Sequence, residues 1–103
     1  MGSTTIIITA DHGGPAGGLL HNTPTDAGAY IVPFIVSGPG VAAGADLYAL
    51  NQGTRQNPGT AQVGPTGPQP IRGHDMANLA LDILGLPAIP GSAVNSNQDL
   101  AVN

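Results

Sequence analysis

The segment TTIIITADHGG at residues 4–14 limits the possible folds of this chain more than any other stretch. Its first six residues are all β-branched, and such an unbroken run is typical of a strand buried on both faces in the parallel sheet of an α/β protein. Asp11 and His12 follow the run. Neighbouring side chains on a strand point to opposite faces, so these two can converge only where the strand has ended and the backbone turns. The two glycines that follow permit such a turn, because glycine reaches backbone conformations closed to other residues.

Two further elements are predicted. Residues 30–37 (YIVPFIVS) form a second candidate strand, which Pro33 should place at a sheet edge or at a bulge because proline cannot donate to the ladder. Apolar residues 76, 79, 80, 83 and 84 recur at the spacing of one helix face. Asp75 is a natural N-cap for this helix, and Gly85 suits the position just after its end.

The chain is expected to be a single α/β domain spanning residues 1–103, since 103 residues can bury only a modest core. Residues 51–70 are dense in Gly, Pro, Asn and Gln without an apolar period, which predicts a long flexible loop. The 16 glycines and 10 prolines raise the question of disorder, but a hydrophobic fraction of 41% argues against it.

Charge and hydropathy exclude several classes of partner. Six Asp against two Arg give a formal charge of −4, so nothing in the chain could neutralise a nucleic-acid backbone. No apolar run approaches the roughly 20 residues that span a bilayer, so no membrane span is expected. The first residues lack the basic and apolar regions of a secretory signal, and the absence of cysteine fits any compartment. The localisation is therefore not determined by the sequence.

The Asp11-His12 pair is a candidate half-site for zinc or another divalent metal. In open α/β sheets ligands bind at the carboxyl ends of the strands, and Asp and His are both zinc ligands. His21 lies nine residues further on, across a glycine-rich connection, and is the third candidate ligand. The alternative is that Asp11 caps a turn and His12 is an ordinary surface residue. The residues alone leave both interpretations open.

Three linked blocks of sequence carry a resemblance to a known family. They are TTIIITADHGG, then HNTPTDAGAYIVPFIVSGPGVAAGADLYALN, then PIRGHDMANLALDILGLPAIPGS. Together they resemble the C-terminal part of the alkaline phosphatase superfamily, in the branch of type I phosphodiesterases, nucleotide pyrophosphatases and sulfatase-like hydrolases. The resemblance implies part of a large α/β/α sandwich with a two-metal site, usually zinc, at the strand ends. Members of this kind are often periplasmic or extracellular.

The resemblance also assigns roles to single residues. The aspartate and histidine of the family's DHG motif bind one metal of the pair, and they match Asp11 and His12. A histidine shortly before the VPF block binds the other metal, and it matches His21. His74 stands where the family is expected to have a small polar residue, so it is not predicted to be a ligand.

The family's nucleophile, a Thr or Ser, is not matched, because Thr4, Thr5 and Thr9 lie in the strand itself and only ten residues precede Asp11. The chain is therefore expected to be the C-terminal metal-site portion of a metal-dependent hydrolase of small phosphate or sulfate esters, inactive alone. The alternative is a non-catalytic binding or self-assembling protein that reuses the sheet fragment. A fragment of a sandwich exposes strand edges and an apolar face. We therefore expect a homo-oligomer or pairing with a complementary N-terminal half.

Overall fold

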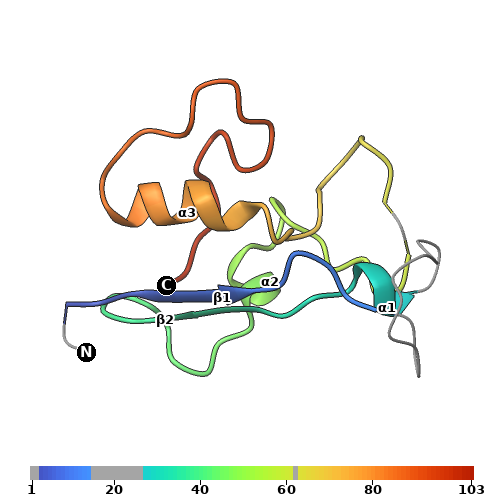
Figure 1. Cartoon of the computed structure of the whole chain (residues 1–103), viewed down its shortest axis with the longest axis horizontal. Helices are drawn as coiled ribbons and strands as arrows, with labels where there is room; N and C mark the ends of the chain where they lie inside the picture. The colour runs from blue at the N-terminus through green and yellow to red at the C-terminus, as the bar shows by residue number, and fades with distance from the viewer. Residues whose placement is uncertain (1–2, 15–26, 62) are drawn as a thin grey trace.

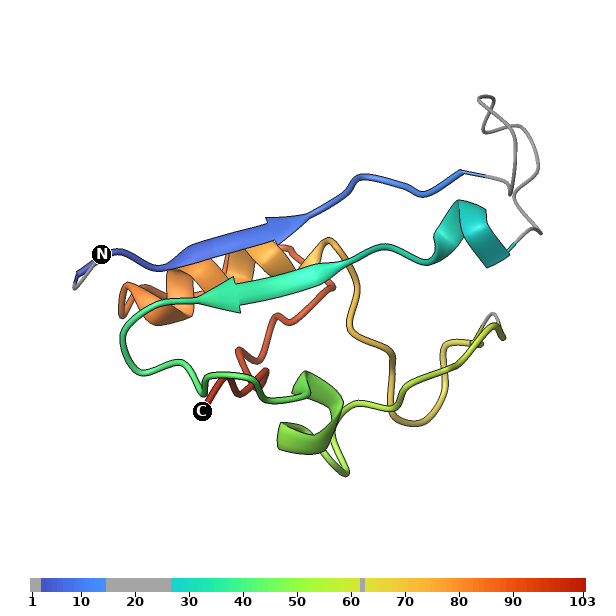
Figure 2. The same cartoon turned by 90° about the horizontal axis from the view of Figure 1, so that it is seen from below.

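The computed structural model describes residues 3–14, 27–61 and 63–103. In chain order these residues form β1 (Ile6–Thr9), α1 (Ala27–Tyr30), β2 (Phe34–Ser37), α2 (Leu47–Leu50) and α3 (Asp75–Ile83). The fold therefore mixes helices and strands. Helix α3 lies along one face of the two-stranded sheet, and the C-terminal segment folds back over that helix (Figure 1). Figure 2 shows the other face of the sheet with no helix across it.

The two strands pair antiparallel, with Ile7 opposite Val36 and Ile8 opposite Ile35. Ile8 and Ile35 are 52% and 53% exposed. The prediction of a strand buried on both faces of a parallel sheet is therefore wrong for the described residues. A β-branched run reflects how well such side chains fit a pleated backbone, and it carries no information about how many faces of the strand are covered.

The second predicted strand begins later than expected. Tyr30 is the last residue of α1, and β2 starts at Phe34, directly after Pro33. Proline is tolerated at the start of a strand because its missing N–H is not needed there. The Thr9 hydroxyl donates to the Pro33 carbonyl at 2.7 Å, which ties the end of β1 to the start of β2.

The predicted helix is confirmed as α3, and its C-terminus ends as expected. Of its predicted apolar face only Leu79 is buried, because Met76, Ile83 and Leu84 are 40%, 39% and 70% exposed. Gly85 has a φ of 73°. Its N–H donates to the carbonyl of Asp82, and the N–H of Leu86 donates to that of Leu81. These are the two hydrogen bonds of a Schellman motif, which requires the left-handed conformation that glycine adopts without strain.

Asp75 does not cap the helix as predicted. The N-cap position is occupied by His74, whose side chain makes no capping hydrogen bond, and Asp75 is the first helical residue. One carboxylate oxygen of Asp75 accepts from the Arg72 N–H at 2.6 Å, and the other accepts from Arg55 Nη1 at 2.8 Å. A buried arginine thus uses the carboxylate that the sequence pattern had assigned to the helix amides.

Arg55 lies within the segment predicted to be a long loop, and it anchors that segment to two other parts of the chain. Its Nη2 atom donates to Asn95 Oδ1 and to Asp99 Oδ1, both at 3.2 Å. Burial alone would lower the pKa of Arg55, but the hydrogen bonds and negative charges of Asp75 and Asp99 outweigh it and raise the pKa above its ordinary value. The described residues between 51 and 70 contain no helix or strand, only isolated bridges at Arg55. The flexibility of this segment stays a prediction.

The interior of the described chain is more polar than apolar. Leu79 and Leu100 are the buried large hydrophobic residues, whereas Asn51, Arg55, Asp75, Asn78 and Asn95 are also buried. The Asn51 amide bonds the backbone of Ala101 in both directions, at 2.8 Å and 2.7 Å, and therefore holds the C-terminal segment. None of the helices within residues 3–14, 27–61 and 63–103 is long and apolar enough to cross a membrane.

Candidate metal site and the hollow beside it

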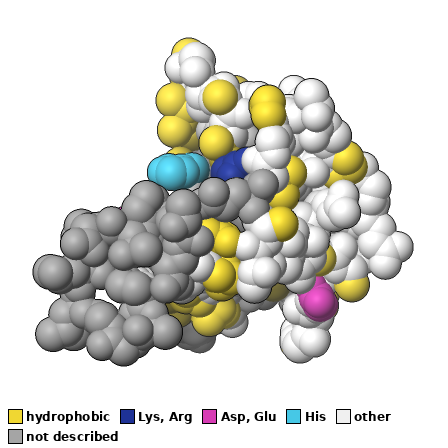
Figure 3. Space-filling model, turned by 90° about the vertical axis from the view of Figure 1, so that its right-hand side faces the viewer, with side chains coloured by type: hydrophobic (Ala, Val, Ile, Leu, Met, Phe, Trp, Pro, Cys, Tyr) yellow, Lys and Arg dark blue, Asp and Glu magenta, His cyan; other side chains and the backbone are white. Residues whose placement is uncertain are grey.

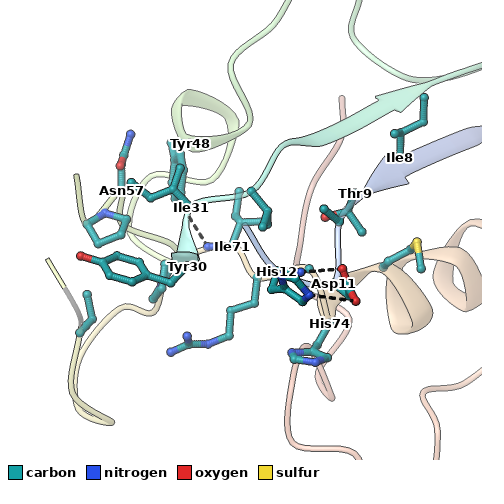
Figure 4. A pocket seen from close by; sticks show the side chains of 18 of the residues that line it. Ile8, Thr9, Asp11, His12, Tyr30, Ile31, Tyr48, Asn57, Ile71 and His74 are labelled. Carbon is teal, nitrogen blue, oxygen red and sulfur yellow. Dashed lines mark hydrogen bonds and ion pairs between the residues drawn. The ribbon is translucent and has the colours of Figure 1, made fainter. Parts of the chain in front are cut away.

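Asp11 and His12 lie just beyond the end of β1, where the backbone has left the strand. Their side chains converge there, with His12 Nε2 3.6 Å from Asp11 Oδ2 (Figure 4). The backbone N–H of His12 donates to Asp11 Oδ1 at 2.9 Å. Each aspartate oxygen therefore faces a different part of the same histidine. The aspartate side chain is largely exposed and the histidine side chain is about half exposed.

The other ring nitrogen of His12 determines how the ring is oriented. Nδ1 lies 2.6 Å from the carbonyl oxygen of Gly13. A carbonyl can only accept, so Nδ1 carries the proton in this hydrogen bond, and in the neutral ring Nε2 is then the nitrogen with the lone pair. Metal-binding histidines very often donate their second ring nitrogen to a backbone carbonyl in this way, which fixes the ring and its tautomer.

Gly13 has a different function from the one predicted. Neither Gly13 nor Gly14 has a positive φ, so the turn does not depend on a conformation reserved for glycine. A Cβ atom at Gly13 would lie only 1.9 Å from the carbonyl oxygen of Gly28 in α1. The glycine is needed because the backbone after His12 passes against that helix with no room for a side chain.

A second glycine brings a distant segment to the same place. A Cβ at Gly73 would lie 3.0 Å from the carbonyl oxygen of Ala10 and 3.4 Å from Thr9 Oγ1. The turn that carries Arg72 and His74 therefore packs directly on the end of β1. Figure 4 shows the His74 ring beside Asp11. The sequence did not predict this neighbourhood, because 62 positions separate residues 74 and 12.

These residues stand at the rim of an open hollow of about 1210 Å³. Asp11, His12, Arg72 and His74 form part of its lining, and much of the remainder is apolar or aromatic. The principal apolar and aromatic lining residues are Tyr30, Ile31, Tyr48, Val63, Ile71 and Met76. Figure 3 shows a cationic side chain beside a histidine, with hydrophobic side chains on both sides of them.

The hollow contains both tyrosines of the chain, and neither was singled out by sequence reasoning. Each hydroxyl is occupied by a backbone group. The Tyr48 hydroxyl accepts from the Ile71 N–H at 3.0 Å, and the Tyr30 hydroxyl donates to the Thr60 carbonyl. The rings are thereby held as walls of the hollow. The small number of aromatic residues, three in 103, was the one signal that could have drawn attention to them.

The third predicted ligand, His21, lies outside the described residues. Within residues 3–14, 27–61 and 63–103, no three His, Cys, Asp or Glu side chains are grouped so as to hold a metal ion. His74 therefore lies near Asp11 and His12 without completing a three-ligand cluster with them.

Comparison of the chain with protein families, with curated proteins and with solved structures finds no match. The resemblance to the alkaline phosphatase superfamily therefore depends on the three sequence blocks alone.

Proposed function

We propose that this chain supplies the Asp-His half of a divalent metal site in a hydrolase of phosphate or sulfate esters. The spacing of Asp11 and His12 is the observation that carries the proposal. Two ligand atoms that each lie about 2.0–2.2 Å from one zinc ion in tetrahedral geometry are about 3.3–3.6 Å apart. His12 Nε2 and Asp11 Oδ2 are 3.6 Å apart, so one ion fits between them with little movement of either side chain.

The donor set also suits zinc chemically. A carboxylate and an imidazole oriented by a backbone carbonyl are ordinary zinc ligands. A catalytic zinc generally takes three protein ligands. The resemblance offers His21, which in the family belongs to the second metal of the pair. Bound metal would supply a Lewis acid, and the residues described here would position it at the end of β1.

The chain alone is expected to be inactive towards esters. Its threonines at the strand do not match the family's nucleophile motif, and covalent catalysis without a nucleophile typically loses several orders of magnitude in rate. We expect no turnover of p-nitrophenyl phosphate, its phosphodiester analogue or its sulfate. Turnover that co-purifies with the chain and disappears in Asp11→Ala would contradict this part of the proposal.

Metal binding is tested by titrating zinc while following the ring resonances of the three histidines. The resonances of His12 and His21 should shift below millimolar zinc, and Asp11→Asn should raise the zinc concentration needed for half of that shift at least tenfold. Asp82→Asn is the matched control, because it removes one exposed carboxylate from α3 at a distance from β1's end and should leave the titration unchanged. The proposal fails if His12 does not respond, or if the two variants behave alike.

A second candidate is a non-catalytic binding or self-assembling protein. It is favoured by the half-exposed pair Ile8 and Ile35 on the sheet face that no helix covers. Sedimentation of the isolated chain at micromolar concentration tests it. A concentration-dependent mass that falls on Ile35→Ser would support assembly through this face, and a monomer at all concentrations would refute self-assembly.

A further inference from the structure

The hollow beside Asp11 and His12 has two chemically different parts. At the end of β1 lie the carboxylate and the two histidines, together with Arg72. To one side of them lie the rings of Tyr30 and Tyr48 and the side chain of Ile31 (Figure 4), and Val63 and Met76 also line the hollow. The three aliphatic side chains are each at least 39% exposed although they are large and apolar. Solvent-facing apolar side chains gathered around one concavity are typical of a ligand site.

Charge is also concentrated in this place. The chain has two arginines and no lysine, and one of the arginines, Arg55, is buried against Asp75. Arg72 is therefore the one exposed arginine, although the chain as a whole has a net charge of −4. Its Nη2 donates to Gln69 Oε1 at 2.8 Å, and its backbone N–H is bonded to Asp75. These contacts hold Arg72 in a turn that packs on the end of β1 through Gly73.

From this arrangement we infer that the hollow takes an ester whose alcohol part is apolar and ring-containing, with its anionic group towards Arg72. The inference depends on the proposed function for the identity of the anionic group as a phosphate or sulfate. The rings of Tyr30 and Tyr48 form the walls for the alcohol part, because their hydroxyls are occupied by backbone groups. A flat ring between such walls gains both apolar burial and favourable aromatic contact.

Binding of 1-naphthyl phosphate to the full chain is the test, followed by NMR at the Tyr30 and Tyr48 rings and at the Met76 methyl. Inorganic phosphate and 1-naphthol are the comparison probes, since each carries one half of the ligand. We expect 1-naphthyl phosphate to bind about tenfold or more tightly than either half, because both parts of the hollow are then used. Equal affinity for inorganic phosphate would overturn the apolar part, and equal affinity for 1-naphthol would overturn the anionic part.

Two surface isoleucines provide a matched pair of variants. Ile31 and Ile35 are 50% and 53% exposed, but only Ile31 lines the hollow. Ile31→Ser should weaken 1-naphthyl phosphate several-fold, and Ile35→Ser should not. Arg72→Gln should abolish the preference for 1-naphthyl phosphate over 1-naphthol. If the two isoleucine variants bind alike, the inference is wrong.

The outcomes separate this inference from the metal proposal. Zinc binding at His12 without a preference for 1-naphthyl phosphate would support the proposed metal site and refute the inference of an apolar ester ligand. A preference for 1-naphthyl phosphate without zinc binding would support the site for an amphiphilic anion and refute the proposed metal site. Resonances of Tyr30 and Met76 that shift with protein concentration alone would mean that a second copy of the chain occupies the hollow, and would refute the inference.

Discussion

Replacing Asp75 by Asn should destabilise this chain more than the same exchange at any other aspartate that the structure describes. The Asp75 side chain is completely buried and the Arg55 side chain is 7% exposed, with 2.8 Å between their charged atoms. Asparagine has the same shape and keeps an oxygen that can accept from the Arg72 N–H. Its amide nitrogen then faces Arg55 Nη1, so the substitution removes both the negative charge and the acceptor of the Arg55 hydrogen bond, and it leaves the guanidinium buried.

The magnitude follows from what remains around Arg55. Removing one partner of a buried ion pair costs about 3–5 kcal/mol, because the other charge is left without compensation. Asp99 still contacts Arg55 at 3.2 Å, but its side chain is 44% exposed, so solvent screens much of that attraction. We therefore expect the lower part of the range, about 3 kcal/mol. Arg55 keeps its charge in the variant, because a guanidinium is not deprotonated in proteins even when its counter-ion is removed. In the wild-type protein the raised pKa means that the charged Arg55 stabilises the folded state at every pH below the ordinary arginine pKa.

Urea unfolding followed by far-UV circular dichroism and tyrosine fluorescence measures this cost. Asp99→Asn is the control, because it removes an equal charge from the exposed side of Arg55 and should cost at most about 1 kcal/mol. The double variant Arg55→Met with Asp75→Asn should be more stable than Asp75→Asn alone, since it no longer buries an uncompensated cation. If Asp75→Asn costs no more than Asp99→Asn, Arg55 is solvated in solution and the reasoning is refuted.

Glycine positions give further predictions with close controls. Gly13→Ala should displace the Asp11-His12 segment and weaken zinc binding, because its Cβ would overlap the Gly28 carbonyl, whereas the new Cβ of Gly14→Ala meets nothing within 4 Å and should be tolerated. The histidine resonances and the zinc affinity of the two variants test this, and equal behaviour would contradict the packing of that segment on α1. Gly85→Ala should cost about 1–2 kcal/mol in urea unfolding, because φ is 73° there. Gly64→Ala, at an open position without a positive φ, should be neutral, and a neutral Gly85→Ala would show that α3 ends differently.

The local elements of the fold could be predicted because their signals lie within a few residues of sequence. The apolar period identified α3, and Gly85 marked its end, since a Schellman motif needs a left-handed residue at one defined position. The start of that helix was harder. Asp75 has the residue type of an N-cap, but its carboxylate is used by Arg55, twenty positions earlier. A local rule fails when a tertiary partner binds the same group more strongly.

The candidate site was predictable only in its local half. Asp11 and His12 are adjacent, so their convergence depends on where one strand ends, and the β-branched run indicated that point. Arg72 and His74 reach the same place through the approach of Gly73 to the Ala10 carbonyl, a contact between segments far apart in sequence. No spacing rule connects such segments. The covering of the sheet was unpredictable for the same reason, because it depends on how many other elements pack there.

The polar interior connects the stability of this chain to its surfaces. Burying a large apolar side chain contributes roughly 1.5–3 kcal/mol, and two such side chains, Leu79 and Leu100, are buried among the described residues. The buried amides and ions contribute less net free energy, because each hydrogen bond only replaces one made with water. Their geometry instead determines which segments lie together, as Arg55 does for the helix and the C-terminal segment. A fold organised in this way has precise contacts and a small margin of stability. Any partner, metal or ligand that covers the exposed isoleucines at the sheet or the hollow would therefore raise the stability of the whole chain, by mass action on the folded state.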